Sequence, residues 1–444
     1  MNIAVIGTGY VGLVSGVCFS DLGNKVICVD KDQSKIDMLN NMDVPIYEPG
    51  LKELIKKNVE KGNLTFTSEI SKGVTEADVI IIAVGTPPLP SGEANLSFIE
   101  QVAKDIATEM NTYKIVMTKS TVPVGTNEQI QQIISRNTDQ PFDVVSVPEF
   151  LREGSAVHDT FNPDRIIIGV ESKQAEDVII ELHKPLTEKI IVTDIRSAEM
   201  IKYASNAFLA TKISFINEIA NICEKVGADV TKVANGMGLD KRIGSAFLNA
   251  GIGYGGSCFP KDTQALIQIA GNEDYEFKLL KSVVQVNNEQ RYNIIEKLKQ
   301  SLGSLSGQTI AIWGLAFKPD TDDVRDAPAK EIIEELNKAG AHIKAYDPIA
   351  MENFKSLIEA NENIEWCVSA KEATEGSHAV CLLTDWKEFK DLKLLKSVQN
   401  GMKQPIFVDG RNVFTKEDIQ ETGFEYISIG RPSMKGRIPV TVTQ

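Results

Sequence analysis

The sequence predicts an α/β protein in which two doubly wound parallel sheets are joined by a long helix. Three observations predict this class. Up to about residue 190 the chain alternates short apolar strands with amphipathic stretches, a pattern typical of parallel sheets with crossover helices. Residues 197–226 then contain no Gly or Pro, and from Gly303 a second alternating unit begins.

The predicted strands of the first unit are short apolar runs. They are Asn2–Ile6, Lys25–Val29, Val79–Val84, Ile115–Thr118, Val144–Val147 and Arg165–Val170. None approaches the ~20 apolar residues that are needed to cross a bilayer, so we expect no membrane span. The first residues lack the basic region of a signal peptide, and we expect no targeting segment.

Composition argues against several classes of partner. The formal net charge of −14 disfavours nucleic acid and anionic membrane surfaces. The six cysteines are scattered without a CxxC pair, which predicts a reducing cytoplasm. None of the four histidines is spaced as a metal pair, so we expect no zinc site.

Residues 197–226 are predicted to form one helix that ends at Gly227. At 1.5 Å per residue it would be about 45 Å long. Its apolar positions, among them Ile201, Phe208 and Ile216, lie on more than one side. The helix therefore links domains or packs against a second copy of itself, or else it is a core helix within one subunit.

The second alternating unit repeats the order of the first. Thr309–Trp313 is a predicted strand, a helix follows near Ala329–Ala339, and Ile343–Tyr346 is the next strand. In both units the first strand ends before a glycine and the second before an aspartate. From Met434 the chain has no periodicity, so we expect a loose tail.

Gly7-Thr8-Gly9-Tyr10-Val11-Gly12 is a G-x-G-x-x-G motif. It follows a strand, opens an apolar helix and meets Asp30 at the end of the next strand, as in Rossmann-like dinucleotide-binding domains. The glycines let a pyrophosphate approach the helix N-terminus, where free N–H groups bind anions. Asp30 would accept hydrogen bonds from ribose hydroxyls, which favours NAD over NADP, although Lys31 and Lys35 weaken that preference.

The second unit lacks these glycines and reads Gly-Leu-Ala-Phe-Lys-Pro from Gly314. A dinucleotide could not approach as closely there. Lys318, Arg325 and Arg411 place cations around its sheet. Either this unit holds another phosphate-bearing ligand, such as a nucleotide, or these are solvated surface charges.

Polar residues follow several strands of the first unit. In open α/β sheets, ligands bind beyond the carboxyl ends of the strands. Candidates for the neighbourhood of cofactor and substrate are therefore Thr86, Thr121, Glu149 and Glu153. The alternative is that their Thr-Pro and Pro-Glu contexts only form turns.

Lys202 and Asn206 are four residues apart in the long helix and so share a face. Apolar neighbours would desolvate this lysine and make it available for proton transfer. The alternative is a lysine that reaches back to solvent.

The segment Gly251–Asp262 carries the strongest chemical signal. Its glycines allow the backbone to press against a ligand, and Pro260 and Asp262 suit the first turn of a helix. Cys258 therefore lies at a helix N-terminus, where a thiol becomes a nucleophile, or else it is a buried structural cysteine. The other five cysteines are predicted to be buried in strands or helices.

A nicotinamide site with an activated cysteine suits the oxidation of an alcohol to an acid. The first hydride loss needs no cysteine, but a thiolate can add to the aldehyde and make a tetrahedral carbon that loses a second hydride. Water then hydrolyses the thioester, and two NAD are consumed.

Six segments resemble, in the same order, those of the UDP-glucose dehydrogenases: Gly7–Gly12, Ser120–Thr126, Pro148–Gly154, Lys202–Ala210, Gly255–Asp262 and Phe317–Ala327. They extend over nearly the whole chain. The resemblance implies an NAD-binding Rossmann-like domain (1–196), a long helix with a helical dimerisation and catalytic domain (197–300), and a UDP-sugar-binding Rossmann-like domain (301–444).

The resemblance also implies the four-electron oxidation of UDP-glucose to UDP-glucuronate, by a homodimer formed through helix 197–226. The implied catalytic residues are the nucleophile Cys258, the oxyanion stabilisers Lys202 and Asn206, the pair Asp262 and Thr121 that deprotonates the alcohol with a water, and Glu149 in thioester hydrolysis. Implied NAD contacts are Gly7, Gly9, Tyr10, Val11, Gly12, Asp30, Lys35, Thr86, Thr121, Glu153 and Arg325. Implied substrate contacts are Phe150, Leu151, Glu153, Lys202, Asn206, Tyr254, Gly255, Lys318, Arg411 and Arg242, which in the family can reach the substrate site of the partner subunit.

Three other interpretations stay open. An enzyme acting on GDP-mannose or UDP-N-acetylmannosamine would share the chemistry, although the cysteine loop resembles the UDP-glucose group most. A two-electron 3-hydroxyacid dehydrogenase would share the long helix and the Lys-x-x-x-Asn pair, but not the cysteine loop or the second unit. A nucleotide-sensing regulator would not need Cys258, Lys202 and Asp262 together.

Overall fold

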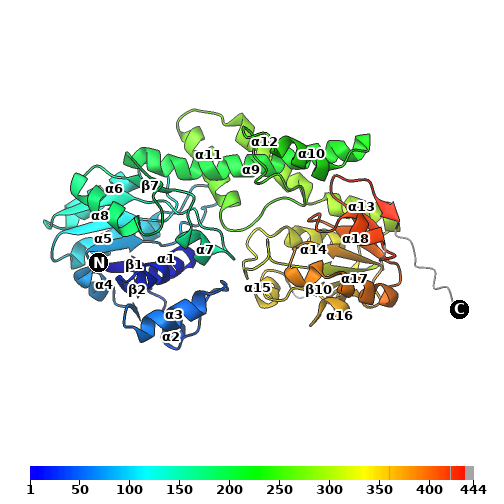
Figure 1. Ribbon diagram of the computed structural model, residues 1–444, viewed down its shortest axis with the longest axis horizontal. Helices are drawn as coiled ribbons and strands as arrows, with labels where there is room; N and C mark the ends of the chain where they lie inside the picture. The colour runs from blue at the N-terminus through cyan, green and yellow to red at the C-terminus, as the bar shows by residue number, and fades with distance from the viewer. Residues whose placement is uncertain (360, 421, 436–444) are drawn as a thin grey trace. The chain divides into compact units, whose positions relative to one another are not determined.

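The computed structural model describes residues 1–359, 361–420 and 422–435. The chain forms two compact units, each built around its own sheet. Unit 1 comprises residues 1–206 and 264–275, and unit 2 comprises residues 207–263 and 276–444. Two of the three boundaries fall within helices, because α9 (Ile195–Val226) and α11 (Phe259–Asn272) each contribute residues to both units (Figure 1).

Unit 1 contains an eight-stranded sheet with the order β3-β2-β1-β4-β5-β6-β7-β8. Its strands are β1 (Asn2–Ile6), β2 (Lys25–Val29), β3 (Leu64–Thr67), β4 (Val79–Ile82), β5 (Lys114–Thr118), β6 (Phe142–Ser146), β7 (Ile166–Gly169) and β8 (Ile190–Thr193). The six predicted strands are confirmed. The sequence does not predict β3 and β8, because these edge strands are partly exposed and their apolar runs are short.

One pairing in this sheet departs from the parallel arrangement that we predicted. Strand β7 runs antiparallel to β6, with Ser146 opposite Gly169, whereas β7 and β8 are parallel to each other. A buried apolar run has the same side-chain pattern in either direction, so periodicity carries no information on strand orientation. The prediction of an all-parallel first sheet is therefore wrong at this pair.

Helices cover both faces of the unit 1 sheet (Figure 1). Ile3 and Val5 of β1 pack into one apolar cluster, while Ala4 and Ile6 pack into the cluster on the other face. The first cluster includes residues of α1 (Tyr10–Asp21), α2 (Gln33–Asn40), α3 (Leu51–Glu60), α7 (Ala156–Phe161) and α8 (Lys173–His183). The second includes residues of α4 (Ile70–Glu76), α5 (Ser97–Glu109) and α6 (Thr126–Asn137).

Unit 2 contains a seven-stranded sheet with the order β11-β10-β9-β12-β13-β14-β15. Its strands are β9 (Thr309–Trp313), β10 (His342–Tyr346), β11 (Ile364–Trp366), β12 (Ala379–Leu382), β13 (Ile406–Asp409), β14 (Glu425–Ser428) and β15 (Met434–Lys435). In each unit the first strand lies between the second and the fourth strand. This shared order confirms the predicted second Rossmann-like unit.

The helices of unit 2 include α14 (Pro328–Lys338), which is shifted by one residue from the predicted range. The others are α10 (Val230–Gly238), α12 (Lys278–Gln290), α13 (Asn293–Leu302), α15 (Met351–Lys355), α16 (Ala370–Thr374), α17 (Leu392–Val398) and α18 (Lys416–Gln420). Helices α12 and α13 follow each other after the glycine-rich segment and belong to the helical middle part of the chain.

The expectation of a loose tail from Met434 is wrong for its first two residues. Met434 and Lys435 form β15, which pairs antiparallel with Tyr426 and Glu425 of β14. The edge of β14 offers backbone N–H and C=O groups that pair without regard to side-chain periodicity. The rest of the tail, residues 436–444, lies outside the described residues.

Helix α9 confirms the predicted long helix and begins two residues earlier, at Ile195. It appears in green in Figure 1. One side is buried in the cores of the two units, while Phe208, Phe215 and Ile222 are 65%, 48% and 54% exposed. The three exposed residues are spaced by seven and so follow one stripe along the helix. None of the helices in the described ranges is long and apolar enough to cross a membrane.

Candidate functional site

The glycine motif of unit 1 forms the turn between β1 and α1. Gly7 adopts a φ of +101°, and a Cβ there would lie 2.7 Å from the carbonyl oxygen of Ala83. A Cβ at Gly12 would overlap the Gly7 carbonyl oxygen. At Gly9 a Cβ would meet nothing within 4 Å. Packing therefore requires the first and third glycines, while the second leaves open space where α1 begins.

This open space suits an anion. Gly9 is the N-cap of α1 and brings no side chain to cap it, so the first-turn N–H groups can serve a ligand. The next residues, Tyr10 and Val11, start the helix, and the Tyr10 hydroxyl donates to the carbonyl of Tyr47. A dinucleotide pyrophosphate would approach the turn at Gly9, where a Cβ would meet nothing within 4 Å.

Asp30 follows β2 and is anchored to the same turn. Its Oδ2 accepts hydrogen bonds from Thr8 N and Thr8 Oγ1 at 2.8 and 2.7 Å, and its Oδ1 accepts from Asp32 N. Burial alone would raise the pKa of Asp30, but these hydrogen bonds and the charge of Lys35 lower it. The group is therefore held as a carboxylate, the form that accepts from ribose hydroxyls.

Unit 2 has a different arrangement at the corresponding aspartate. Asp347 is buried and accepts hydrogen bonds from the indole of Trp386 and from four backbone N–H groups, those of residues 315, 316, 349 and 350. A Cβ at Gly314 would overlap the side chain of Thr384. The carboxylate of Asp347 is thus used inside the unit, in agreement with the prediction that unit 2 does not repeat the dinucleotide site.

Two separate contacts involve the predicted polar residues at the strand ends of unit 1. Thr86, after β4, donates through Oγ1 to the carbonyl of Thr121, after β5, at 2.9 Å. Glu149, after β6, forms an ion pair of 2.8 Å with Lys119, which also follows β5. The structure therefore brings the ends of these three strands together, as the sequence predicts.

Both oxygens of the Glu149 carboxylate have partners. Its Oε2 contacts Lys119 Nζ, and its Oε1 accepts from the N–H groups of Phe150 and Leu151 at 2.8 and 3.1 Å. Burial alone would raise the pKa of Glu149, but the charge and hydrogen bond of Lys119 bring it below its ordinary value. Glu149 is therefore an anion that also fixes the turn carrying Phe150.

Lys202 is buried, which rejects the alternative of a lysine that reaches solvent. Its Nζ lies 3.4 Å from Asn206 Oδ1, and it stands over the ring of Phe150 at 5.1 Å from the centroid. The guanidinium of Arg165 stacks on the same ring at 3.8 Å. Glu153, three residues after Phe150, is also buried and lies at the start of the turn before α7.

Cys258 lies at the N-terminus of α11, as predicted. Its carbonyl accepts the first helical hydrogen bond, from Asp262 N at 2.8 Å, and its thiol is 3.5 Å from Ser257 Oγ. Cys258 is exposed, whereas the other five cysteines are buried. Four of those five lie in strands or helices; Cys367 instead follows β11. The buried Asp262 pairs with Lys261 at 2.6 Å.

The predicted cations of unit 2 have different surroundings. Arg411 is half-buried among three segments, and its guanidinium donates to the carbonyls of Gly253, Phe317 and Leu383. Burial lowers the pKa of Arg411, but an arginine stays charged. Arg325 forms a two-pronged pair with the neighbouring Asp323.

Two other predicted substrate residues lie at the surface of unit 2 or close to it. Lys318 stands over the ring of Phe317 at 5.1 Å. Arg242 is exposed and pairs with Asp240, whose hydrogen bonds raise the pKa of the guanidinium. The glycine segment that contains Tyr254 and Gly255 is buried.

The predicted residues divide between the units. Unit 1 holds Gly7, Gly9, Tyr10, Val11, Gly12, Asp30, Lys35, Thr86, Thr121, Glu149, Phe150, Leu151, Glu153, Lys202 and Asn206. Unit 2 holds Arg242, Tyr254, Gly255, Cys258, Asp262, Lys318, Arg325 and Arg411. Thr86, Thr121 and Glu149 lie at the carboxyl ends of strands, whereas Lys35 lies in α2 and Arg242 pairs with Asp240 at the surface.

Sequence reasoning missed several residues that hold this site together. Lys119 pairs with Glu149, Arg165 stacks on Phe150, and Glu199 accepts from the N–H groups of Gly125 and Asn127 at the start of α6. A charged residue directly after an apolar strand was the available signal for Lys119. No local pattern marks the other two.

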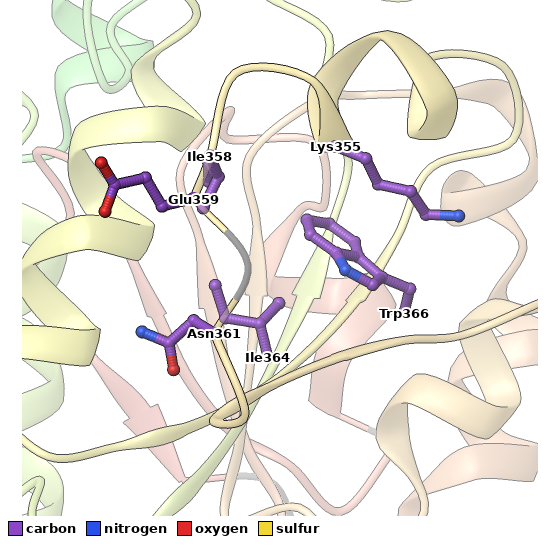
Figure 2. A pocket seen from close by; sticks show the side chains of 6 residues that line it. All are labelled: Lys355, Ile358, Glu359, Asn361, Ile364 and Trp366. Carbon is purple, nitrogen blue, oxygen red and sulfur yellow. The ribbon is translucent and has the colours of Figure 1, made fainter.

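A small pocket of about 200 Å³ lies elsewhere in unit 2. Figure 2 shows the side chains that line it, which are Lys355, Ile358, Glu359, Asn361, Ile364 and Trp366. It contains none of the predicted site residues. Across the described part of the chain, no group of three or more His, Cys, Asp or Glu side chains is arranged to hold a metal ion.

Comparison with known proteins covers nearly the whole chain. Residues 1–187, 196–289 and 311–416 match the NAD binding, central and UDP binding domains of the UDP-glucose/GDP-mannose dehydrogenase family. The chain is 54% identical to UDP-glucose 6-dehydrogenase TuaD of Bacillus subtilis (strain 168), over 99% of this chain and 95% of that protein.

Two solved structures have the same fold over 97% of this chain. A UDP-glucose dehydrogenase from Pyrobaculum islandicum superposes with a TM-score of 0.89 at 35% identity, over 98% of its length. The UDP-D-ManNAc dehydrogenase of Pyrococcus horikoshii superposes with a TM-score of 0.85 at 27% identity, over 99% of its length. Together with the glycine turn, the Asp30 carboxylate and the exposed Cys258, these matches show that the chain belongs to the UDP-glucose/GDP-mannose dehydrogenase family of NAD-dependent oxidoreductases.

Proposed function

We propose that the protein oxidises UDP-glucose to UDP-glucuronate in two successive steps, with a thiohemiacetal and then a thioester on Cys258. The observation that carries this proposal is the placement of Cys258, which is exposed at a helix N-terminus while the other five thiols are buried. A helix N-terminus favours the thiolate, which is the nucleophilic form. The 54% identity with a UDP-glucose 6-dehydrogenase supports this substrate over other sugar nucleotides.

In the first oxidation, the C6 alcohol of the sugar becomes an aldehyde. Asp262, with Thr121 and a water, takes up the hydroxyl proton, while Lys202 and Asn206 stabilise the negative charge that develops on the oxygen. The bound NAD supplies the acceptor for one hydride in each of the two oxidations.

In the second oxidation, the sulfur of Cys258 adds to the aldehyde carbon and forms the thiohemiacetal. Loss of the second hydride from that carbon leaves a thioester. Water attacks the thioester with the participation of Glu149, which releases the carboxylate and the free thiol. The sum is one UDP-glucose, two NAD⁺ and one water converted to UDP-glucuronate, two NADH and protons.

We assign the binding roles residue by residue. The NAD contacts are Gly7, Gly9, Tyr10, Val11, Gly12, Asp30, Lys35, Thr86, Thr121, Glu153 and Arg325. The UDP-sugar contacts are Phe150, Leu151, Glu153, Lys202, Asn206, Tyr254, Gly255, Lys318 and Arg411, with Arg242 acting on the substrate of the partner subunit. NAD binding belongs to residues 1–196, dimerisation and catalysis to 197–300, and UDP-sugar binding to 301–444.

We further propose a cytoplasmic homodimer. The exposed apolar stripe of α9, formed by Phe208, Phe215 and Ile222, supports association of two copies through this helix. The six free cysteines support a reducing compartment.

The stoichiometry of the reaction tests the proposal. Limiting UDP-glucose with excess NAD is expected to yield two NADH per sugar and UDP-glucuronate, as read by absorbance and mass spectrometry. One NADH per sugar would reject the four-electron reaction. No NADH would reject UDP-glucose as the substrate, and the same assay with GDP-mannose and UDP-N-acetylmannosamine would then identify the alternative.

Variants of Cys258 test the thioester. Cys258→Ser is expected to bind both ligands but to stop before the second NADH, whereas Cys367→Ser, which changes a buried cysteine, is expected to yield two. Unchanged turnover in Cys258→Ser would reject the covalent mechanism.

A further inference from the structure

The backbone of the glycine-rich segment before Cys258 is held mainly by side-chain amides. Gly251 N donates to Asn217 Oδ1 at 2.8 Å, and Gln290 Nε2 donates to Gly251 O at 2.9 Å. Three residues later, Tyr254 N donates to Asn287 Oδ1 at 2.8 Å, and Asn287 Nδ2 donates back to Tyr254 O at 3.1 Å. Three side-chain carboxamides, one from α9 and two from α12, thus bond the backbone N–H and C=O groups of both Gly251 and Tyr254. We call Asn217, Asn287 and Gln290 the carboxamide clamp.

Other contacts complete the hold on this segment. Arg411 donates to Gly253 O, Arg291 donates to Tyr254 O and Asn412 donates to Ala250 O. Main-chain bonds from Ile252 N to Gly410 O and from Gly256 N to Arg325 O fix it further. The segment has irregular structure and is buried, and backbone groups of residues 250–254 and 256 are bonded by partners from distant parts of unit 2.

Close packing also prevents the segment from shifting. A Cβ at Gly253 would lie 2.7 Å from Asn287 Oδ1, and one at Gly256 would lie 2.6 Å from the ring of Phe317. A Cβ at Gly255 would overlap the carbonyl oxygen of Asp326. The backbone is therefore pressed against the clamp on one side and against the loop after β9 on the other.

The three clamp residues are fully buried. Burying a carboxamide is costly unless its donors and acceptors are used. Here Asn217 Oδ1, Gln290 Nε2 and both polar atoms of Asn287 bond the backbone of the segment, while Gln290 Oε1 accepts from Asn221 of α9. Apolar side chains at these positions would leave the buried N–H groups of Gly251 and Tyr254 without these partners. The arrangement instead fixes a backbone path that ends two residues before Cys258.

We propose that Asn287 and Gln290 of α12, with Asn217 of α9, are positioning residues that set where the sulfur of Cys258 stands when the substrate carbon is attacked. This inference rests on the proposed function in one respect, the role of Cys258 as nucleophile. The physical reason is that a misplacement of about 1 Å in a reacting group costs about 100-fold in rate.

Isosteric variants break the clamp without a change in volume. Gln290→Glu replaces the donor to Gly251 O with a carboxylate oxygen. Asn287→Asp keeps the acceptor for Tyr254 N but loses the donor to Tyr254 O, and the guanidinium of Arg291 favours the ionised form of the new carboxyl. The two variants act at different residues of the segment, so each tests the proposal if the other does not fold.

Ser214→Ala is the matched control. Ser214 is buried in α9 and donates to Val283 O of α12 at 2.8 Å, so it joins the same two helices without touching the glycine segment. Loss of this bond lowers the melting temperature but leaves the segment in place. The Ser214→Ala variant therefore separates an effect on the position of Cys258 from a general loss of stability.

The variants are compared in four measurements on the full-length protein: kcat and KM with UDP-glucose and NAD, alkylation of Cys258 by iodoacetamide, deuterium exchange of residues 250–258, and melting temperature. We expect Asn287→Asp and Gln290→Glu to lose about 100-fold in kcat, with faster exchange of the segment. Alkylation should change by less than about threefold, because a small reagent needs no alignment. Ser214→Ala should keep kcat within about twofold.

The outcomes separate the clamp from the proposed function. Active clamp variants, or unchanged exchange of residues 250–258 in both, would overturn the inference while leaving the function intact. If Ser214→Ala lost as much kcat as the clamp variants, the clamp would have only a structural role, and the inference would be overturned as well. A wild-type protein that produced no NADH would reject the proposed function, and the catalytic role of the clamp with it.

Discussion

Lys119 keeps Glu149 ionised in a buried setting. The ion pair is 2.8 Å long and both side chains are largely shielded from solvent. His183, nearby on α8, is buried with its pKa lowered to about 4, first by burial and then by the charge of Lys119, so it stays neutral at physiological pH. Lys202 on α9 is a second cation that acts on Glu149. The charge state of Glu149 therefore depends mainly on one residue that the sequence analysis did not select.

We predict that Lys119→Met destabilises the protein at neutral pH by about 3–5 kcal/mol, because it strands a buried carboxylate. In the native protein the pKa of Glu149 is lowered, so its contribution to stability is present above its ordinary pKa and lost as pH falls. Without Lys119, burial raises that pKa, and the free energy of unfolding falls as pH rises. Urea titrations from pH 4 to 8 measure this reversed slope.

Lys114→Met provides the control for this prediction. Lys114 is also buried on β5, but its Nζ donates to the carbonyls of Thr75 and Ala77 and leaves no carboxylate behind when it is removed. The variant should be destabilised without a change in the pH slope. A Lys119→Met protein with the wild-type slope would contradict the assignment.

A second pair of residues distinguishes the two sheets. Asp30→Asn should raise KM for NAD by about tenfold or more, because a charge-assisted hydrogen bond to ribose is lost. Asp347→Asn should leave that KM within about twofold but lower the free energy of unfolding by about 2 kcal/mol or more, because it strands buried N–H donors. Steady-state kinetics and chemical denaturation measure both. A raised KM for NAD in Asp347→Asn would contradict the division of roles.

At the scale of elements, helix α9 has two different faces along its length. Its buried face contributes Lys202 and Asn206 to unit 1 and Asn217 to unit 2, while its exposed stripe is apolar. The residues of the stripe are spaced by seven, which keeps them on one side of a helix that packs along a partner. A helix with this division of faces can serve both catalysis and association.

We predict that Phe215→Glu converts a dimer to monomers, because it places a charge in the centre of the stripe formed by Phe208, Phe215 and Ile222. Sedimentation velocity across a concentration series measures the change. Val368→Glu, at an exposed apolar residue of the second sheet's loops, should leave the mass unchanged. If Phe215→Glu sediments like the wild type, association does not use this stripe.

At the scale of the whole molecule, each sheet is expected to respond to its own ligand. The first four strands of each sheet have the same order, but only unit 1 has the open glycine turn, and only unit 2 joins half-buried Arg411 to the clamped segment. Ligand binding stabilises the region that holds it. The two units can therefore be mapped separately.

We predict that NAD alone slows deuterium exchange in residues 3–13 and 28–36, whereas UDP alone slows exchange in residues 250–256 and 314–326. Exchange followed by mass spectrometry measures both patterns in one protein. Protection of residues 314–322, a range that excludes Arg325, by NAD would contradict the assignment, since Gly314 and Asp347 are committed to contacts inside unit 2.

The sequence by itself determined the features that depend on neighbouring residues. The strands β1, β2 and β9, the long helix α9, the glycine turn with Asp30 and the position of Cys258 at a helix start were all predicted and are confirmed. Their signals are apolar periodicity, Gly and Pro placement and short motifs, which act over a few residues and can be read without a partner.

Only the tertiary structure decided where the buried polar groups find their partners. The antiparallel pairing of β7 with β6, the ion pair of Lys119 with Glu149, and the hydrogen bond from Tyr254 N to Asn287 all join residues far apart in the chain. A lysine after a strand, or an asparagine in a helix, has the same local pattern whether it faces solvent or a buried carbonyl. Burial makes an unpaired polar group costly, and the partner that satisfies it is set by the packing of distant elements, which no local pattern records.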